Sequence, residues 1–291
     1  MRTTVWAIAM SAALALPVAG ATARVHVGTV KSADGVSIRY DSTGSGELAL
    51  VFIHCWTCHR GFWDAQVAHF APRYRVVRLD LAGHGDSGGG RNDYTIAAFA
   101  EDVVAVIDAL GLKQVVLIGH SMGGPVALQA EKTLGARVLG VVGVDCFYLG
   151  FQSSARDGEP LRLARDQTTV PEFDGGERKP ARTLYASGTA AGLIDDIARS
   201  MAATDRAIAL SALHGTYVWY RTDATAALQR VGARLRNING DPWGDREPLH
   251  PSVALIRGAA HFPAQEKPEE FNRVLEKIVQ EFVGSSIRNL D

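Results

Sequence analysis

The chain has 291 residues, of which 47% are apolar and 21% are charged, and its formal net charge at pH 7 is −1. This composition is typical of a globular protein that consists of one large domain, or of one domain with an insertion. The near-neutral charge and the lack of a basic run argue against nucleic acid or an anionic membrane as the main partner.

The N-terminus has the pattern of an export signal. Arg2 is followed by an apolar stretch over residues 5–18, and Ala21-Thr22-Ala23 offers the small residues of a signal peptidase site. The apolar stretch is shorter than the roughly 20 residues that a membrane-spanning helix needs. We therefore expect residues 1–23 to be a cleaved signal peptide and the mature protein to be periplasmic or secreted, without stable membrane insertion.

After residue 23, β-rich segments alternate with amphipathic helical segments. This alternation predicts an α/β fold with a mostly parallel, eight-stranded sheet and helices on both of its faces. The first two strands are expected to form an antiparallel pair, joined by the turn Ala33-Asp34-Gly35. The expected strands are residues 24–30, 36–40, 48–54, 74–79, 114–118, 138–144, 235–239 and 253–256, and the expected helices are residues 95–110, 122–134, 193–213 and one that begins at Pro268.

The alternation stops between residues 150 and 230. This stretch is polar at first, with several prolines and glycines, and it then becomes helical. We interpret it as a helical cap insertion over the carboxyl edge of the sheet, which divides a core formed by residues 24–149 and 231–291.

Residues 119–123 read Gly-His-Ser-Met-Gly and directly follow an apolar strand. A tight reversal from this strand into a helix places the middle residue in a strained backbone conformation and requires glycines on both sides of it. Such a turn exposes a serine hydroxyl above the sheet, at the start of a helix. The motif therefore predicts Ser121 as a nucleophile.

A serine nucleophile needs a base, and His261 is the candidate. It lies in Gly258-Ala259-Ala260-His261-Phe262-Pro263, after the last expected strand and before the last helix. This place in the chain brings His261 to the same edge of the sheet as Ser121 and suits it to accept the serine proton.

Four segments together resemble the α/β-hydrolase superfamily, and specifically its capped serine esterase-like members. The resemblance spans residues 45–283, and it implies that the backbone N–H groups of Trp56 and Met122 form the oxyanion hole. It also implies that the second of the four segments is a structural turn. The segments are Phe52-Ile53-His54-Cys55-Trp56, Asp80-Leu81-Ala82-Gly83-His84-Gly85-Asp86-Ser87, Gly119-His120-Ser121-Met122-Gly123 and Gly258-Ala259-Ala260-His261-Phe262-Pro263.

The first departure from the superfamily is Cys55, which stands where other members carry glycine. A β-carbon at this position would tighten or reshape the oxyanion loop. Cys55-Trp56-Thr57-Cys58-His59 also matches the C-x-x-C-H signature of covalent haem attachment, but haem would occupy the oxyanion loop, so we expect neither cofactor nor metal. Cys55 and Cys58 are expected to pair with each other or to remain free, and a bridge from either one to Cys146 is the further alternative.

The second departure concerns the acid that supports the histidine. The usual acid position is occupied by Trp243, in Gly240-Asp241-Pro242-Trp243. Asp145 is the favoured candidate, because it ends an apolar strand at the active-site edge, where a carboxylate is costly to bury without a partner. Asp241 is the second candidate, and Asp245 is the third.

These residues predict an exported serine hydrolase that cleaves a small or medium carboxylic ester through a Ser-His-Asp triad and an acyl-enzyme. A lactonase, a C–C bond hydrolase, a thioesterase or a cofactor-free haloperoxidase on the same triad is the alternative among enzymes. A non-catalytic exported binding protein and a haem-bearing redox protein are the alternatives from other classes. The expected partner is a small-molecule ester, the oligomeric state is open, and the candidate pocket residues are His54, Cys55, Phe147, Tyr148, Tyr217, Trp219, Tyr220 and Trp243.

Overall fold

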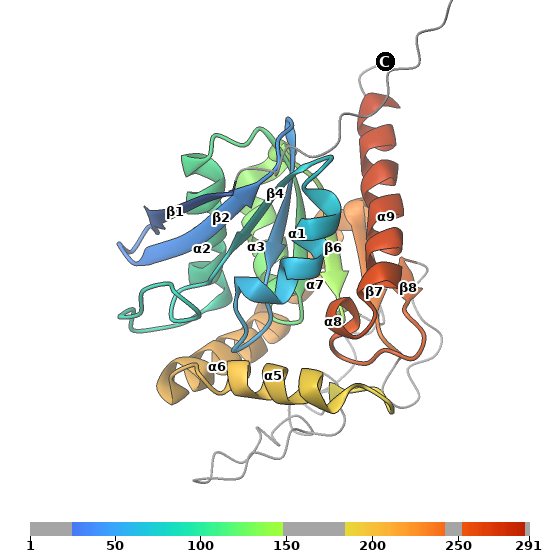
Figure 1. The fold of residues 1–291 in the computed structure, drawn as a ribbon. Coiled ribbons are helices and arrows are strands. Elements are labelled where there is room, and N and C mark those ends of the chain that lie inside the picture. The colour runs from blue at the N-terminus through green and yellow to red at the C-terminus, as the bar shows by residue number, and fades with distance from the viewer. Residues whose placement is uncertain (1–24, 148–183, 242–251, 289–291) are drawn as a thin grey trace, which may run out of the picture.

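The computed structural model describes residues 25–147, 184–241 and 252–288. Within these residues, eight strands form one sheet in the order β1-β2-β4-β3-β5-β6-β7-β8 (Figure 1). The strands are β1 (His26–Lys31), β2 (Ser37–Thr43), β3 (Leu48–Ile53), β4 (Arg75–Leu79), β5 (Gln114–His120), β6 (Val138–Val144), β7 (Leu235–Asn239) and β8 (Val253–Leu255).

The predicted α/β fold with a mostly parallel sheet is confirmed. β1 is antiparallel to β2 and β2 is antiparallel to β4, whereas all the other neighbouring strands pair in parallel. The central strands β3, β5 and β6 are rich in Val, Leu and Ile and are buried almost throughout. Strands of this composition suit a parallel sheet, because helices cover both of its faces.

Helices pack on the two faces of the sheet and create two apolar cores. Side chains of successive strand residues point to opposite faces. Val51 and Leu117 therefore belong to the core beneath one helical layer, while Leu50 and Val116 belong to the core beneath the other. The first layer consists of α2 (Ile96–Ala109), α3 (Gly123–Leu134) and α7 (Ala224–Val231), and the second consists of α1 (Asp64–Phe70) and α9 (Pro268–Arg288) (Figure 1).

The helix expected at residues 193–213 is two helices in the structure. α5 (Ala191–Met201) and α6 (Arg206–Thr222) are separated by a short break. Asp205 causes the new start, because its side chain accepts hydrogen bonds from the backbone N–H groups of Ala207 and Ile208 at the beginning of α6. Both helices lie across the end of the sheet where β6 ends (Figure 1).

The remaining short elements are η1 (Arg60–Trp63), η2 (Gly135–Arg137), η5 (Gly232–Arg234) and α8 (Pro263–Glu266). No helix in the described part of the chain combines the length and the apolar character that crossing a bilayer requires. The expected signal peptide (1–23), the first part of the expected cap insertion (150–183), Tyr148, Trp243 and Asp245 lie outside the described residues.

Candidate active site

The candidate nucleophile Ser121 lies in the turn between β5 and α3. Its φ is +51°, its backbone N–H donates to the carbonyl oxygen of Val144 at 2.9 Å, and its own carbonyl oxygen accepts from the N–H of Gly124 at 3.0 Å. A β-carbon on Gly119 would collide with the backbone of Gly123. The two glycines of the motif are therefore required by the close approach of strand and helix.

The loop after β3 lies beside this turn. Ile53 of β3 pairs with Gly119 of β5, so Trp56 and Met122 each lie three residues beyond a paired position. A β-carbon on Gly123 would stand only 2.6 Å from the carbonyl oxygen of Ile53, so the start of α3 packs directly on the end of β3. This register brings the backbone at Trp56 and Met122 to the same edge of the sheet.

His261 and Asp145 form a close pair at that edge. The Nδ1 atom of His261 lies 2.6 Å from Oδ2 of Asp145, and Oδ1 of Asp145 accepts from the backbone N–H of Gly240 at 3.0 Å. The side chain of Asp145 is 3% exposed and that of His261 is 14% exposed, so water competes little for the contact. Because a carboxylate accepts, Nδ1 of His261 donates, which fixes the orientation of the imidazole ring.

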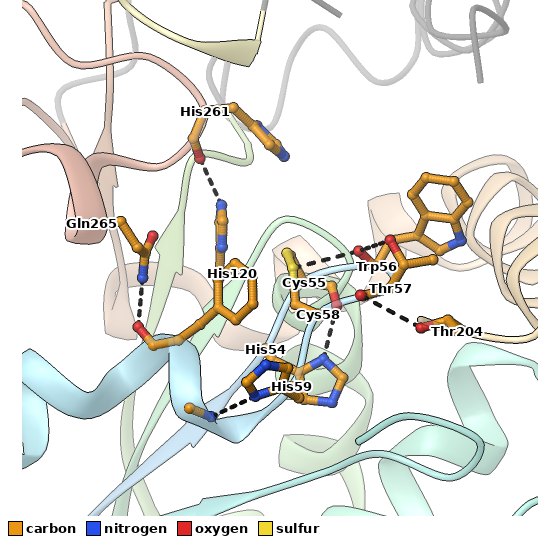
Figure 2. The surroundings of a disulfide bond; sticks show 12 residues. His54, Cys55, Trp56, Thr57, Cys58, His59, His120, Thr204, His261 and Gln265 are labelled. Atoms are coloured by element: carbon orange, nitrogen blue, oxygen red, sulfur yellow. Dashed lines mark hydrogen bonds between the residues drawn. A yellow bond between two sulfur atoms is a disulfide. The ribbon is translucent and has the colours of Figure 1, made fainter. Parts of the chain in front are cut away.

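His120, the residue before Ser121, also orients the His261 loop. Its Nε2 lies 2.6 Å from the carbonyl oxygen of His261, and a carbonyl oxygen only accepts, so Nε2 of His120 donates (Figure 2). Burial lowers the pKa of His120 to about 3, and the nearby His261 acts in the same direction. His120 is therefore a neutral donor, a role that the variable position of a G-x-S-x-G motif does not reveal from sequence.

The second candidate acid, Asp241, has different partners. Its Oδ2 accepts from the backbone N–H of Gly258 at 2.7 Å, and its Oδ1 lies 3.3 Å from a guanidinium nitrogen of Arg257. Its side chain is 45% exposed. The structure thus brings Asp145 and His261 together, while Asp241 holds the turn that precedes the His261 loop.

Two of the expected pocket residues, His54 and Cys55, are buried. His54 is fully buried, and both of its ring nitrogens bond to the backbone of the protein itself. Cys55 is 2% exposed and forms a disulfide with Cys58 (Figure 2). Both side chains therefore face the protein interior, where Cys55 packs in one apolar cluster with Ile197 and Phe262.

The disulfide decides between the alternatives for the three cysteines. Cys55 pairs with Cys58, and Cys146 is a free, buried thiol whose pKa is raised by burial. The pairing occupies both sulfur atoms that thioether attachment of haem would require. His59 of the same motif is also engaged, because its Nδ1 accepts from the N–H of Gly61 at 3.0 Å. Within the described segments, no group of three or more His, Cys, Asp or Glu side chains is arranged to hold a metal ion.

Residues of α6 and the adjoining loops complete the surroundings of the site. The indole N–H of Trp56 donates to the carbonyl oxygen of Ala209 in α6 at 2.7 Å. Phe147 and Tyr220 pack with ring centroids 6.2 Å apart, and Trp219 donates from its indole N–H to Gln129. Trp219 is therefore part of the core, and Tyr220 packs against the core as well as against Phe147, which follows β6.

Residues 50–274 match the alpha/beta hydrolase family, and the chain therefore belongs to this family. The dihydrolipoyllysine-residue acetyltransferase component of the acetoin cleaving system of Cupriavidus necator is 29% identical over 262 residues, which cover 84% of this chain and 67% of that protein. A non-heme chloroperoxidase of Streptomyces lividans is 39% identical over 100 residues, and a bifunctional esterase/perhydrolase of Acinetobacter calcoaceticus is 37% identical over 100 residues. The latter two matches span only 36% of the length of each relative.

Solved structures are similar over most of the chain. A thermophilic esterase from Thermogutta terrifontis superposes with a TM-score of 0.71 at 22% identity, over 88% of this chain and 99% of that one. An N-acyl homoserine lactone degrading enzyme superposes with a TM-score of 0.70 at 24% identity, over 86% of this chain and 99% of that one. At these identities the likeness establishes the fold.

Proposed function

We propose that this chain is a serine hydrolase that cleaves small or medium carboxylic esters through an acyl-enzyme. The observation that carries the proposal is the 2.6 Å contact between Nδ1 of His261 and the carboxylate of Asp145, at the edge of the sheet where Ser121 lies. Because Nδ1 of His261 donates to Asp145, the Nε2 of the neutral imidazole carries no proton and is able to accept one.

In the proposed reaction, the hydroxyl oxygen of Ser121 attacks the ester carbonyl carbon while Nε2 of His261 takes the hydroxyl proton. The alcohol then leaves with that proton, and a water molecule attacks the acyl-enzyme with His261 again as the base. The carboxylate of Asp145 stabilises the imidazolium that forms in both steps. The backbone N–H groups of Trp56 and Met122 are proposed to bind the developing oxyanion.

We also propose that the protein is exported and acts on a small molecule in the periplasm or outside the cell. The sequence pattern of residues 1–23 supports export. The Cys55–Cys58 disulfide is compatible with an oxidising compartment.

The direct test is the hydrolysis of a short-chain nitrophenyl ester by the wild-type protein and by Ser121→Ala. We expect Ser121→Ala to lower kcat by at least about 10⁴-fold, because the nucleophile is lost. Ser45→Ala is the matched control, since Ser45 is exposed in the turn before β3 and lies at the opposite edge of the sheet. This control is expected to retain the wild-type kcat.

A fluorophosphonate probe provides a second readout, because it labels an activated serine covalently. We expect the folded wild-type protein to be labelled at Ser121. Ester hydrolysis that persists in Ser121→Ala would reject the mechanism, and a folded protein that neither hydrolyses the ester nor takes the label would instead favour the non-catalytic binding protein.

Perhydrolysis is a second candidate activity, and the matches to a non-heme chloroperoxidase and to an esterase/perhydrolase favour it. Hydrogen peroxide in place of water would attack the acyl-enzyme and release a peracid and the free serine. The assay is peracid formation from a short ester and hydrogen peroxide, and the absence of peracid alongside normal ester hydrolysis would exclude this activity.

A further inference from the structure

The loop after β3 contains a β-turn that the disulfide closes. The N–H of Cys58 donates to the carbonyl oxygen of Cys55 at 3.1 Å, and the α-carbons of the two residues are 5.2 Å apart. Thr57, the third residue of the turn, has a φ of +56°. This backbone conformation favours glycine and disfavours a β-branched residue, so the turn needs contacts that hold it in place.

His54 holds the same carbonyl group from a second direction. The backbone N–H of Leu81 donates to Nε2 of His54 at 2.9 Å, so the ring proton is on Nδ1, which donates to the carbonyl oxygen of Cys55 at 2.8 Å (Figure 2). Burial, together with the neighbouring His84, lowers the pKa of His54 well below its usual value. His54 is therefore a neutral donor in a single tautomer.

The carbonyl group of Cys55 and the N–H of Trp56 belong to one peptide unit. This unit is planar, and in the trans form its C=O and N–H bonds point in opposite directions. Two donors, from His54 and Cys58, hold the carbonyl oxygen inside the turn. The N–H of Trp56 consequently points away from the turn, and no described residue accepts a hydrogen bond from it.

Burial makes the disulfide a permanent part of this arrangement. Cys55 is 2% exposed and Cys58 is 1% exposed. They pack in one apolar cluster with Ile197 of α5 and with Phe262, the residue after His261. A disulfide that is covered in this way is shielded from reductants while the protein is folded, so it acts as a fixed clamp and not as a redox switch.

We propose that the Cys55–Cys58 disulfide and His54 are positioning groups that lock the Cys55–Trp56 peptide, so that the Trp56 N–H is a preset oxyanion donor. The inference rests on the proposed function. Related sequences carry glycine at the position of Cys55, and a glycine would give this peptide conformational freedom. The cross-link from Cys55 to Cys58 removes that freedom, which gives Cys55 a role in positioning the Trp56 N–H.

The test is the double variant Cys55→Ala/Cys58→Ala, which has lost the cross-link. We expect kcat for a nitrophenyl ester to fall about 10- to 100-fold, because misdirecting an oxyanion donor costs less than the 10²–10³-fold loss for removing one. KM is expected to stay close to the wild-type value. A trifluoromethyl ketone, which adds to Ser121 to give an oxyanion, is expected to bind more weakly by the same factor, whereas its non-fluorinated methyl ketone is not.

Ile197→Ala is the matched control for lost packing. Ile197 lies in the same apolar cluster but is not part of the turn. We expect this variant to lower the thermal midpoint and to leave the ratio of the two ketone affinities unchanged. A general loss of stability would lower both affinities in the double variant, whereas misdirection of the Trp56 N–H lowers only the affinity for the fluorinated ketone.

His54→Asn and His54→Phe keep the inference testable if the double variant does not fold. The amide of Asn can still donate to the carbonyl oxygen of Cys55, while Phe cannot. We expect His54→Phe to lose kcat and the preference for the fluorinated ketone, and His54→Asn to restore most of both.

A folded double variant, or a folded His54→Phe, with wild-type kcat and ketone preference would overturn the positioning role and leave the proposed function intact. A wild-type protein that neither hydrolyses esters nor is labelled at Ser121 would overturn the proposed function, and this inference with it.

Discussion

Four residues other than glycine in the described part of the chain have a positive φ, and all four follow the ends of strands at one edge of the sheet. Thr57 follows β3, Ser121 follows β5, and Asp145 and Phe147 follow β6, with φ values from 49° to 56°. A side chain in this region costs roughly 1–2 kcal/mol, so it persists only where the surrounding contacts hold it. Such clustering is typical of functional sites.

Asp145 is the residue whose role mutation can test most sharply. In Asp145→Asn, the amide oxygen can still accept from Gly240, but the amide N–H₂ faces Nδ1 of His261 and would force the ring proton onto Nε2. His261 could then not accept the serine proton. We expect kcat to fall on the order of 10³–10⁴-fold with little change in the thermal midpoint, as measured by ester hydrolysis and thermal unfolding.

Asp241→Asn is the matched control. Asp241 accepts from the backbone N–H of Gly258, and an Asn oxygen can accept the same bond. We expect little change in kcat for this variant. Equal and mild losses in both variants would contradict the assignment of Asp145 as the acid of the triad.

At the scale of elements, Glu266 at the end of α8 ties together two segments that adjoin the site. Its Oε1 accepts from the N–H of Ala186 at 3.0 Å and from the hydroxyl of Thr189 at 2.9 Å, both in the segment before α5. Its Oε2 accepts from the N–H of Ala260, the residue before His261. The carboxylate of Glu266 therefore connects the loop that carries His261 to the segment that precedes α5.

Glu266→Ala removes these three hydrogen bonds. We expect the free energy of unfolding to fall by about 2–3 kcal/mol, because a hydrogen bond to a charged group contributes roughly 1.5–3 kcal/mol and the half-buried side chain shares its bonds with water. Chemical denaturation measures the change. Glu47→Ala is the control, since Glu47 is exposed in the turn before β3, and its expected effect is within about 0.5 kcal/mol. A similarly small effect for Glu266→Ala would show that the two segments are held by other contacts.

At the scale of the whole molecule, two neutral histidines are buried beneath the site. Burial lowers the pKa of His120 to about 3 and that of His54 well below its usual value. In the unfolded chain both side chains titrate near pH 6.5. Below that pH the unfolded state binds more protons than the folded state, so lowering the pH favours unfolding.

A neutral His120 contributes to the free energy of unfolding. We expect this contribution to be fully present above about pH 6.5 and to be lost progressively as the pH falls toward about 3. Chemical denaturation between pH 7 and pH 4 measures this loss. In His120→Gln, the amide can still donate to the carbonyl oxygen of His261 but does not titrate, so stability is expected to depend less steeply on pH.

The control for His120→Gln is a substitution of a histidine that lies outside the protein interior. His26 is exposed in β1, and His26→Gln is expected to keep the pH dependence of the wild-type protein. If the free energy of unfolding fell with decreasing pH equally steeply in His120→Gln and in the wild-type protein, groups other than His120 would have to cause the loss of stability in acid.

Much of the fold was predictable because it follows from local pattern. Apolar runs of Val, Leu and Ile predicted the buried strands, and the helix expected at residues 95–110 is α2, which Thr95 caps by accepting from the N–H of Ala98. The single helix expected at residues 193–213 missed the break before α6. A local signal for the break is present, because Thr204 and Asp205 stand where the apolar spacing after Met201 would place an apolar residue, and Asp is a favoured residue at the start of a helix.

The candidate site was predictable to a lesser extent. The elbow around Ser121 and the loop of His261 are each local, so sequence and spacing suffice to propose them. Other contacts at the site join segments that are distant in the chain. Examples are the hydrogen bonds of Glu266, of the His120 ring and of the Trp56 indole, and the latter two also depend on the orientation of the ring. No local pattern reports such contacts.

Short-range periodicity and glycines at fixed spacing are enough to predict the class of fold, the strand-to-helix turn at Ser121 and the edge of the sheet where His261 lies. Which carboxylate faces His261, and which cysteines pair, depends on contacts between segments that are distant in the chain. Asp145 and Asp241 both follow strands at the same edge, and only the packing of β6 beside β7 places one carboxylate, and not the other, 2.6 Å from the imidazole.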